Sequence, residues 1–288
     1  MATTIHDHTF AEVLFEVKNL SLQLGDEGKK NLILRDVNIQ VRNIIRPGMH
    51  QGQVVALLGP SGIGKTQLFL RMSGLEKPTS GEVLVGNGTL HPVKPGQVGV
   101  VFQNYPIEPS LVVMDTLIRA GMQAGLKKAE ARDKGRSLLD QFGLTGREQF
   151  YPRQLSGGQR QRVAIIEQLM CSERIILMDE PFSGLDYAAK ESACELINQV
   201  AIQHEENTII IVTHDIDTGL QIADSVWLMG RERDEQGKMI PGARVMEVLD
   251  LIQWGIAWRP GVQFTPEFAD LVQQVKRKFV DPQGWYVS

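Results

Sequence analysis

The stretch Gly59-Pro60-Ser61-Gly62-Ile63-Gly64-Lys65-Thr66 decides the fold of this chain. It follows an apolar run, Val54–Leu58, that predicts a buried strand. It precedes Gln67–Met72, in which Leu68, Phe69 and Met72 fall on one helical face. A strand, a glycine-rich loop and a helix in this order form the context of a phosphate-binding loop. The glycines allow successive backbone N–H groups to turn inward, and the helix adds its positive N-terminal end.

Every residue of this stretch is expected to line a phosphate site. Lys65 is predicted to reach the β- and γ-phosphates of a nucleotide, and the Thr66 hydroxyl is predicted to bind Mg²⁺. The alternative is a glycine-rich turn that binds nothing, but the strand and the helix on either side favour the phosphate-binding loop. The motif alone predicts a nucleotide site and does not choose among P-loop enzymes.

The composition of the whole chain limits the classes of protein that it can belong to. Its 288 residues allow one large domain or two small ones. The net charge of -4 argues against a nucleic-acid partner bound through bulk charge. Two cysteines, Cys171 and Cys194, are too few for a disulfide scaffold, and we interpret them as small buried side chains of a protein in a reducing compartment.

Membrane association is expected to come through a partner. No apolar run approaches the about 20 residues that cross a bilayer, and residues 1–8 lack the pattern of a signal peptide. We therefore expect a protein that is soluble by itself. His6-Asp7-His8 could be a metal site, but no third ligand follows at a suitable spacing, and we interpret it as a solvated tail.

The segments on either side of the loop predict an α/β architecture. Val13–Leu24 and Asn31–Val41 have the pattern of two strands, which we expect to form an antiparallel layer beside the nucleotide pocket. Arg42–Gln53 is interpreted as a surface insertion. Pro109–Cys171 is helical in pattern and predicts a helical lobe inserted in the α/β core, at about residues 105–170.

Two further apolar runs end in polar residues that suit nucleotide chemistry. The four apolar residues Ile175–Met178, after Arg174, precede Asp179-Glu180-Pro181, and in a parallel sheet the carboxyl end of such a strand faces the ligand crevice. Asp179 is predicted to bind Mg²⁺ and Glu180 to polarise the attacking water. The alternative is a surface turn, which the phosphate-binding loop disfavours. Thr208–Val212 leads to His214, which is therefore placed to touch the γ-phosphate.

The C-terminal part, residues 231–288, is expected to be a helical extension. Trp254 and Trp258 are four residues apart and are predicted to share a helix. Thr265 is predicted to cap a further helix with an apolar stripe. The stripe could be a docking surface, but packing against the core is the favoured interpretation.

A second motif, Leu155-Ser156-Gly157-Gly158-Gln159, resembles the signature of the ATP-binding cassette (ABC) family. Ser156 and the two glycines open a helix, and a helix N-terminus is an anion site. A chain that already holds phosphate at Gly59–Thr66 does not need a second such site for its own nucleotide, so we expect this one to serve another copy. The resemblance implies the same arrangement, a head-to-tail dimer with two ATP molecules between loop and signature.

The resemblance extends from about Val13 to Met229 and assigns roles to further residues. Gln103 matches the Q-loop glutamine, which contacts Mg²⁺ and senses the membrane partner. Ser183-Gly184-Leu185-Asp186 matches the D-loop at the dimer seam, and His214 matches the switch histidine. The implied fold is a RecA-like P-loop NTPase core with an antiparallel β subdomain and an inserted α-helical subdomain, at residues 10–230.

The sequence also departs from the family pattern. The aromatic residue that stacks on adenine is missing near Leu24. Ile165-Ile166-Glu167-Gln168 stands where the family commonly has an Arg-Ala pair, which we expect to alter packing and not chemistry. The tail is too short for the regulatory domain of sugar importers, so the chain is more similar to nitrate, sulfonate or taurine importer cassettes.

The resemblance implies an ATPase subunit that couples hydrolysis to transport, with ATP and Mg²⁺ as its cofactors and Thr66, Gln103 and Asp179 at the metal. It implies a homodimer or heterodimer of cassettes bound to integral membrane permease subunits at the cytoplasmic face of the membrane. A periplasmic or extracellular solute-binding protein would complete an importer of a small anion or polar solute. A non-transport cassette of DNA repair or the ribosome is the alternative, disfavoured by the single P-loop and the short segment between Gln103 and Leu155. A third alternative is a soluble P-loop kinase, which is disfavoured because this chain carries the signature Leu155–Gln159 and such kinases do not.

Overall fold

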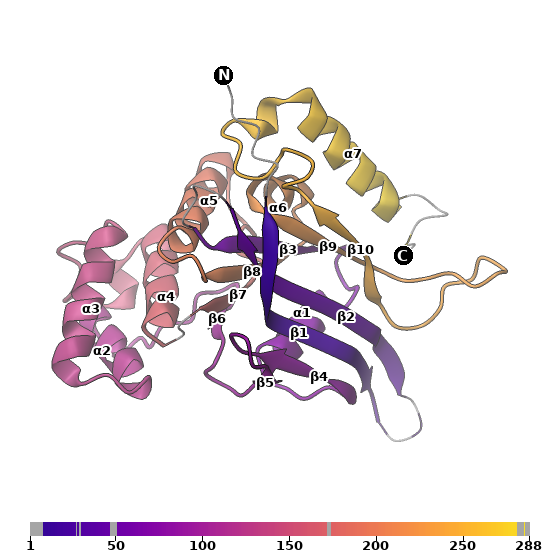
Figure 1. Cartoon of the computed structure of the whole chain (residues 1–288). Helices are drawn as coiled ribbons and strands as arrows, with labels where there is room; N and C mark the ends of the chain where they lie inside the picture. The colour runs from indigo at the N-terminus through magenta and orange to yellow at the C-terminus, as the bar shows by residue number, and fades with distance from the viewer. Residues whose placement is uncertain are drawn as a thin grey trace.

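The computed structural model describes residues 8–26, 28, 30–46, 51–171, 174–280 and 285. These residues form two β-sheets, with helices between and beside them and a helical lobe at one side (Figure 1). The first sheet is antiparallel, in the strand order β2-β1-β4-β5. Its strands are β1 (Thr9–Leu24), β2 (Asn31–Ile45), β4 (Ser80–Val85) and β5 (His91–Pro92).

The second sheet carries the nucleotide loop. Its order is β10-β9-β3-β8-β7-β6, and all neighbours are parallel except β10 with β9. Every residue of β3, β7 and β8 is buried, as expected for parallel strands covered on both faces. The strands are β3 (Gln53–Leu58), β6 (Gly99–Val101), β7 (Ile175–Asp179), β8 (Thr208–Thr213), β9 (Ser225–Gly230) and β10 (Arg244–Asp250).

The alternation of side chains along β3 separates the layers. Val55 and Leu57 point into the same apolar cluster as α1 (Lys65–Met72) and the antiparallel sheet, so α1 lies between the two sheets. Ala56 and Leu58 point to the other face, which α6 (Ile216–Ile222) and α7 (Pro266–Val280) cover. α5 (Tyr187–Ala201) packs on this same face, beside β7 and β8.

The helical lobe consists of α2 (Val113–Gln123), α3 (Lys128–Gln141) and α4 (Gly157–Cys171), which lie within the expected range. α4 lies beside the core sheet, while α2 and α3 extend away from it (Figure 1). Two short 3₁₀ helices, Pro152–Gln154 and Val262–Phe264, complete the elements of the described residues.

Three expectations about local structure are wrong. β2 continues to Ile45, and the next residue, Arg46, is 4% exposed. The first part of the expected surface insertion is therefore a strand that ends in a buried arginine. The region after Gly230 is not helical throughout, because β10 joins the core sheet. Trp254 and Trp258 lie in turns, and Trp258 has a left-handed backbone with φ 59°.

The last helix and Cys194 agree with the expectations, whereas Cys171 is less buried than expected. The Thr265 hydroxyl accepts a hydrogen bond from Phe268 N at 3.4 Å, and the apolar stripe of α7 is buried against the core, which supports the packing interpretation. Cys194 is buried and Cys171 is half-buried, and both are free thiols. His6 and Asp7 lie outside the described residues, but His8 is not solvated as expected, because its side chain is 5% exposed and its Nε2 lies 3.3 Å from Asp250 Oδ2. None of the described helices has the length and apolar character needed to cross a bilayer.

Candidate functional site

The loop from Gly59 to Thr66 connects β3 to α1 at the carboxyl edge of the core sheet. Gly62 and Gly64 have φ 78° and 114°, a conformation that side chains disfavour. The Lys65 ammonium, 6% exposed, lies 2.9 Å from Gly59 O and 3.1 Å from Pro60 O. Burial lowers the pKa of Lys65, and the neighbouring carboxylates act in the opposite direction.

Asp179 is the last residue of β7 and has the features of a metal ligand. Burial, followed by the charge of Glu180, raises the pKa of Asp179 to about 6, while Lys65 and a hydrogen bond from the Thr66 hydroxyl oppose this. Its Oδ1 is buried and has no hydrogen bond partner among the described residues. A carboxylate with a free oxygen beside a hydroxyl group fits Mg²⁺, which prefers hard oxygen ligands.

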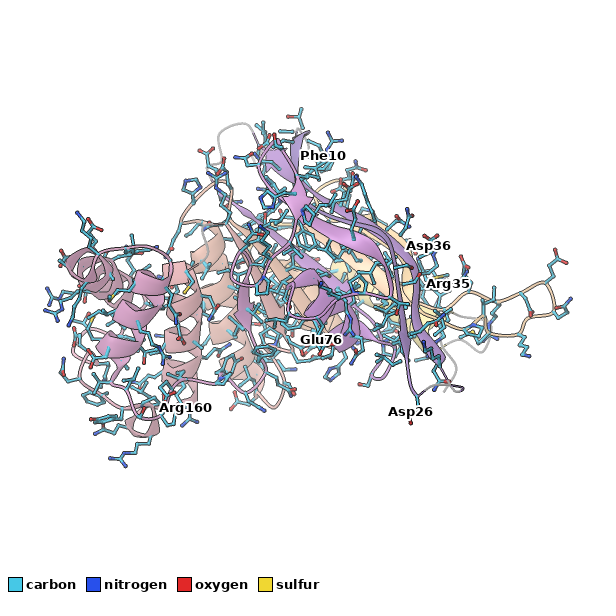
Figure 2. All side chains as sticks on the ribbon, turned by 90° about the horizontal axis from the view of Figure 1, so that it is seen from below. Phe10, Asp26, Arg35, Asp36, Glu76 and Arg160 are labelled. Carbon is cyan, nitrogen blue, oxygen red and sulfur yellow. The ribbon has the colours of Figure 1, made fainter. Side chains whose placement is uncertain are left out.

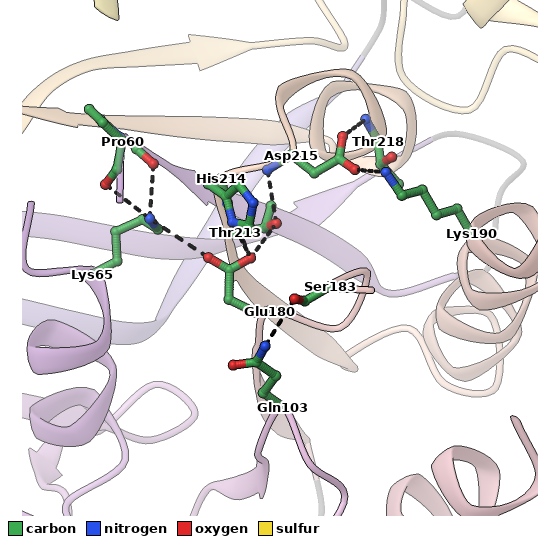
Figure 3. A network of polar contacts seen from close by, with 11 residues as sticks. Pro60, Lys65, Gln103, Glu180, Ser183, Lys190, Thr213, His214, Asp215 and Thr218 are labelled. Atoms are coloured by element: carbon green, nitrogen blue, oxygen red, sulfur yellow. Dashed lines mark hydrogen bonds and ion pairs between the residues drawn. The ribbon is translucent and has the colours of Figure 1, made fainter. Parts of the chain in front are cut away.

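Glu180 is held in place by several donors at once (Figure 3). Its Oε2 accepts from Thr213 Oγ1 at 2.9 Å and from His214 N at 3.3 Å, and it lies 2.9 Å from His214 Nδ1. Its Oε1 lies 3.7 Å from Lys65 Nζ. The Glu180 backbone is left-handed, with φ 48°, which is uncommon for a residue with a long side chain. The strand ends β7 and β8 thus aim this carboxylate at the phosphate loop.

The sequence patterns do not predict a role for Thr213 or the ion pair between Asp215 and Lys190. Thr213 Oγ1 also accepts a hydrogen bond from Asp215 N at 3.1 Å. Asp215 caps α6 through Thr218 N and pairs with Lys190 of α5. A polar residue at the last position of a buried strand is a local signal that could have identified Thr213, whereas the pairing of Lys190 has no such signal.

The Q-loop and D-loop residues meet each other beside Glu180. Gln103 Nε2 donates to Ser183 Oγ at 2.9 Å (Figure 3). Gly184 turns the chain with φ 73°, Leu185 is half-buried, and Asp186 caps α5 by accepting from Ala189 N at 2.8 Å. Both motifs therefore lie next to the turn that carries the catalytic candidate.

The signature lies at the start of α4, on the helical lobe. Ser156 N donates to Gln159 Oε1 at 3.0 Å and Ser156 Oγ accepts from Gln159 N at 3.3 Å, while Leu155 is buried. A Cβ at Gly157 or Gly158 would meet nothing within 4 Å, so this helix tip is open. Figure 2 shows Arg160, the first residue after the signature, at the outer surface of the lobe. Figure 3 shows the loop, carboxylate, switch, Q-loop and D-loop residues close together.

These features define a nucleotide-binding P-loop protein with an inserted helical lobe. Residues 43–183 match the model of the ABC transporter family. The L-cystine transport system ATP-binding protein TcyN of Escherichia coli is 36% identical over 236 residues, which are 77% of this chain and 89% of that protein. The chain belongs to the ABC transporter family.

Other relatives are longer than this chain. The sulfate/thiosulfate import ATP-binding protein CysA 1 of Agrobacterium fabrum is 38% identical over 216 residues, 70% of this chain and 58% of that protein. The Fe(3+) ions import ATP-binding protein FbpC of the same organism is 39% identical over 180 residues, 62% of this chain and 51% of that protein. The chain thus spans a little over half the length of these two relatives.

Solved structures show the same fold. The structure of cbiO1 from Clostridium perfringens, part of the ABC transporter complex cbiONQ, has a TM-score of 0.67 at 24% identity and covers 95% of this chain and 97% of that one. A dimer of the ATP-binding cassette MJ0796 with ADP and Pi has a TM-score of 0.63 at 23% identity, covering 83% and 99%. The expected fold class, an α/β P-loop NTPase fold, is confirmed.

Proposed function

We propose that this chain is the ATP-hydrolysing subunit of an ABC importer. The observation that carries the proposal is the position of Glu180, whose carboxylate is fixed by Thr213 and His214 and faces Lys65. In this proposal residues 10–230 are the cassette, with a helical subdomain at about 105–170, and residues 231–288 are a C-terminal extension that adds β10 and α7 to the core.

Each residue of the site has a role in this reaction. Lys65 and the backbone N–H groups of Gly59–Thr66 bind the β- and γ-phosphates. Thr66 and Asp179, together with Gln103, would hold Mg²⁺, which would supply positive charge beside the phosphates. Glu180 accepts a proton from the attacking water, since its fixed carboxylate lies beside the phosphate loop. His214, at the end of β8, orients that carboxylate and contacts the γ-phosphate.

The active unit in this proposal is a head-to-tail dimer. The helix tip at Ser156–Gly158 is open and offers backbone N–H groups to an anion. In this dimer a second cassette, identical or related, would supply the nucleotide that this tip binds, and Ser183–Asp186 would lie at the seam between the two cassettes. The dimeric cassette among the similar structures supports this arrangement.

Import is favoured because several relatives are named as import proteins for sulfate or Fe(3+). The chain would bind integral membrane permease subunits at the cytoplasmic face, and a periplasmic or extracellular solute-binding protein would deliver the solute. We propose a small anion or polar solute as the cargo. A non-transport cassette is not supported by these relatives.

The test is the variant Glu180→Gln, which removes the proton acceptor and keeps the side-chain shape. We expect ATP hydrolysis to fall by about 100-fold or more, consistent with the contribution of a general base. Light scattering should show that the variant dimerises with Mg²⁺-ATP and remains dimeric. Glu195→Gln, on the exposed face of α5, is the matched control and should hydrolyse ATP at the wild-type rate. Wild-type hydrolysis by Glu180→Gln, or an ATP complex that stays monomeric, would refute the proposal.

A further inference from the structure

Tyr105 follows Gln103 by two residues and joins segments that are far apart in the sequence. Its hydroxyl donates to the carbonyl oxygen of Pro181 at 2.9 Å, across 76 positions of the chain. Its own backbone is left-handed, with φ 46°, and its N–H donates to Phe102 O at 2.9 Å. The side chain is half-buried against the apolar cluster of the helical lobe. A left-handed tyrosine persists only where its surroundings hold it, so this side chain is directed at its partner.

The segment from Gln103 to Tyr105 holds the turn after Glu180 at two points. Gln103 reaches Ser183, and Tyr105 reaches Pro181. Pro181 and Phe182 in this turn are buried, so their backbone groups need hydrogen-bond partners from the protein and not from water. The turn is thus attached to the Q-loop by side chains from one short segment.

The conformation of this turn decides where the Glu180 carboxylate points. Glu180 N donates to Val212 O at 2.7 Å, and Ser183 N donates to Glu180 O at 3.1 Å. The proline ring of Pro181 restricts its φ, which leaves few rotations between the Pro181 carbonyl and the left-handed Glu180. A hydrogen bond that holds this carbonyl therefore restrains the backbone of Glu180 itself.

The helical lobe also comes close to this hydroxyl. Gln161, 5% exposed, lies on α4 one turn after Gly157 and near enough to the Tyr105 hydroxyl to influence its pKa, and its buried Nε2 has no hydrogen-bond partner among the described residues. The tyrosine thus lies where the Q-loop, the turn after Glu180 and the signature helix meet.

We propose that Tyr105 is a positioning residue for Glu180. Its hydroxyl holds the Pro181 carbonyl, and this keeps the turn in the left-handed conformation that aims the carboxylate. Movement of the segment 103–105 or of α4 changes that aim. The inference rests on the proposed role of Glu180 in hydrolysis, and it names the side chain through which the Q-loop acts on it.

The variant Tyr105→Phe removes only the hydroxyl and tests the proposal on the full chain. We expect kcat for ATP to fall about tenfold and KM to change less than about twofold, because the variant alters the aim of the carboxylate and not the phosphate site. Tyr151→Phe is the matched control: it carries the same substitution on a more exposed ring, and its kcat and melting temperature should equal those of the wild type.

A double-mutant cycle separates positioning from general support of the fold. In the Glu180→Gln background, single-turnover hydrolysis should not fall further when Tyr105→Phe is added, because there is no proton acceptor left to aim. An undiminished kcat in Tyr105→Phe, or the same tenfold loss in both backgrounds, would overturn the positioning role. A wild-type protein without ATPase activity would overturn the proposed function and this inference together, whereas the first two outcomes leave the proposed function standing.

Discussion

Replacement of Asp224 by alanine should destabilise the protein more than any exposed change, because this carboxylate joins three segments. Asp224 is 0% exposed. It accepts hydrogen bonds from Arg46 at the end of β2, from Trp258 after β10, and from Val54 N in β3 at 2.7 Å. Burial raises the pKa of Asp224, and the three donors oppose that effect, the Arg46 guanidinium most strongly. The variant Asp224→Ala leaves all three donors without this acceptor.

The magnitude follows from the partners that remain. Removal of one partner of a buried ion pair costs about 3–5 kcal/mol. Arg46 keeps a carbonyl acceptor, Gly52 O at 3.2 Å, and its guanidinium stays 5.3 Å from the Trp258 ring. We therefore expect the free energy of unfolding to fall by about 4 kcal/mol, within this range and not at its upper end. An unfolding entropy of about 2.1 cal/mol/K per residue amounts to about 0.6 kcal/mol/K for this chain, so Tm should fall by about 7 °C.

Scanning calorimetry of the nucleotide-free protein measures this shift. The variant Trp258→Phe keeps a ring near Arg46 and removes one N–H donor, so it should cost about 1 kcal/mol, or about 2 °C. Asp217→Ala breaks an exposed ion pair with Lys276 and should shift Tm by less than about 2 °C. If Asp224→Ala melts within 2 °C of the wild type, the buried cluster does not hold these segments together.

Two further predictions concern a charge and a close contact. Because the pKa of Asp179 is raised to about 6 by burial, the folded protein binds this proton more tightly than the unfolded chain. Asp179→Asn should therefore be more stable than the nucleotide-free wild type at pH 7, with a difference that shrinks as the pH falls through 6 towards 4; a constant difference would contradict this. In urea unfolding, Gly81→Ala should lower the free energy of unfolding by about 1–3 kcal/mol more than the control Gly88→Ala. The angle φ is similar at both positions, but a Cβ at Gly81 would lie 2.4 Å from Asn19 O, whereas one at Gly88 would meet nothing within 4 Å. Equal losses would show that the close contact has no cost.

Local patterns in the sequence predicted the elements that carry the chemistry. The apolar runs at Val54–Leu58 and Thr208–Val212 are buried parallel strands, and the polar residues that follow them meet at one edge of the sheet. The stripe on α7 is buried as its helical period predicts. These signals work because a strand covered on both faces, or an amphipathic helix, imposes its period on neighbouring residues.

The errors have the opposite cause. Arg42–Gln53 resembles a surface insertion because it is polar and contains a Pro-Gly pair, yet Arg46 is a buried anchor whose partner is 178 positions away. Trp258 matches a helical spacing with Trp254, but its indole N–H bonds Asp224 and its backbone is left-handed. In both cases a long-range partner overrides the local pattern.

By itself the sequence determined the phosphate-binding loop, the carboxylate pair at a strand end and the signature helix, because each depends on neighbouring residues with a local geometry. Only the tertiary structure decided how Glu180 is aimed. Its partners Thr213 and His214 are the last residue of β8 and the residue after it, and the hydroxyl that holds its turn comes from Tyr105, 76 residues from Pro181. Hydrogen bonds between distant segments leave no period or motif in the chain, so they are visible only after the sheet has brought the strand ends together.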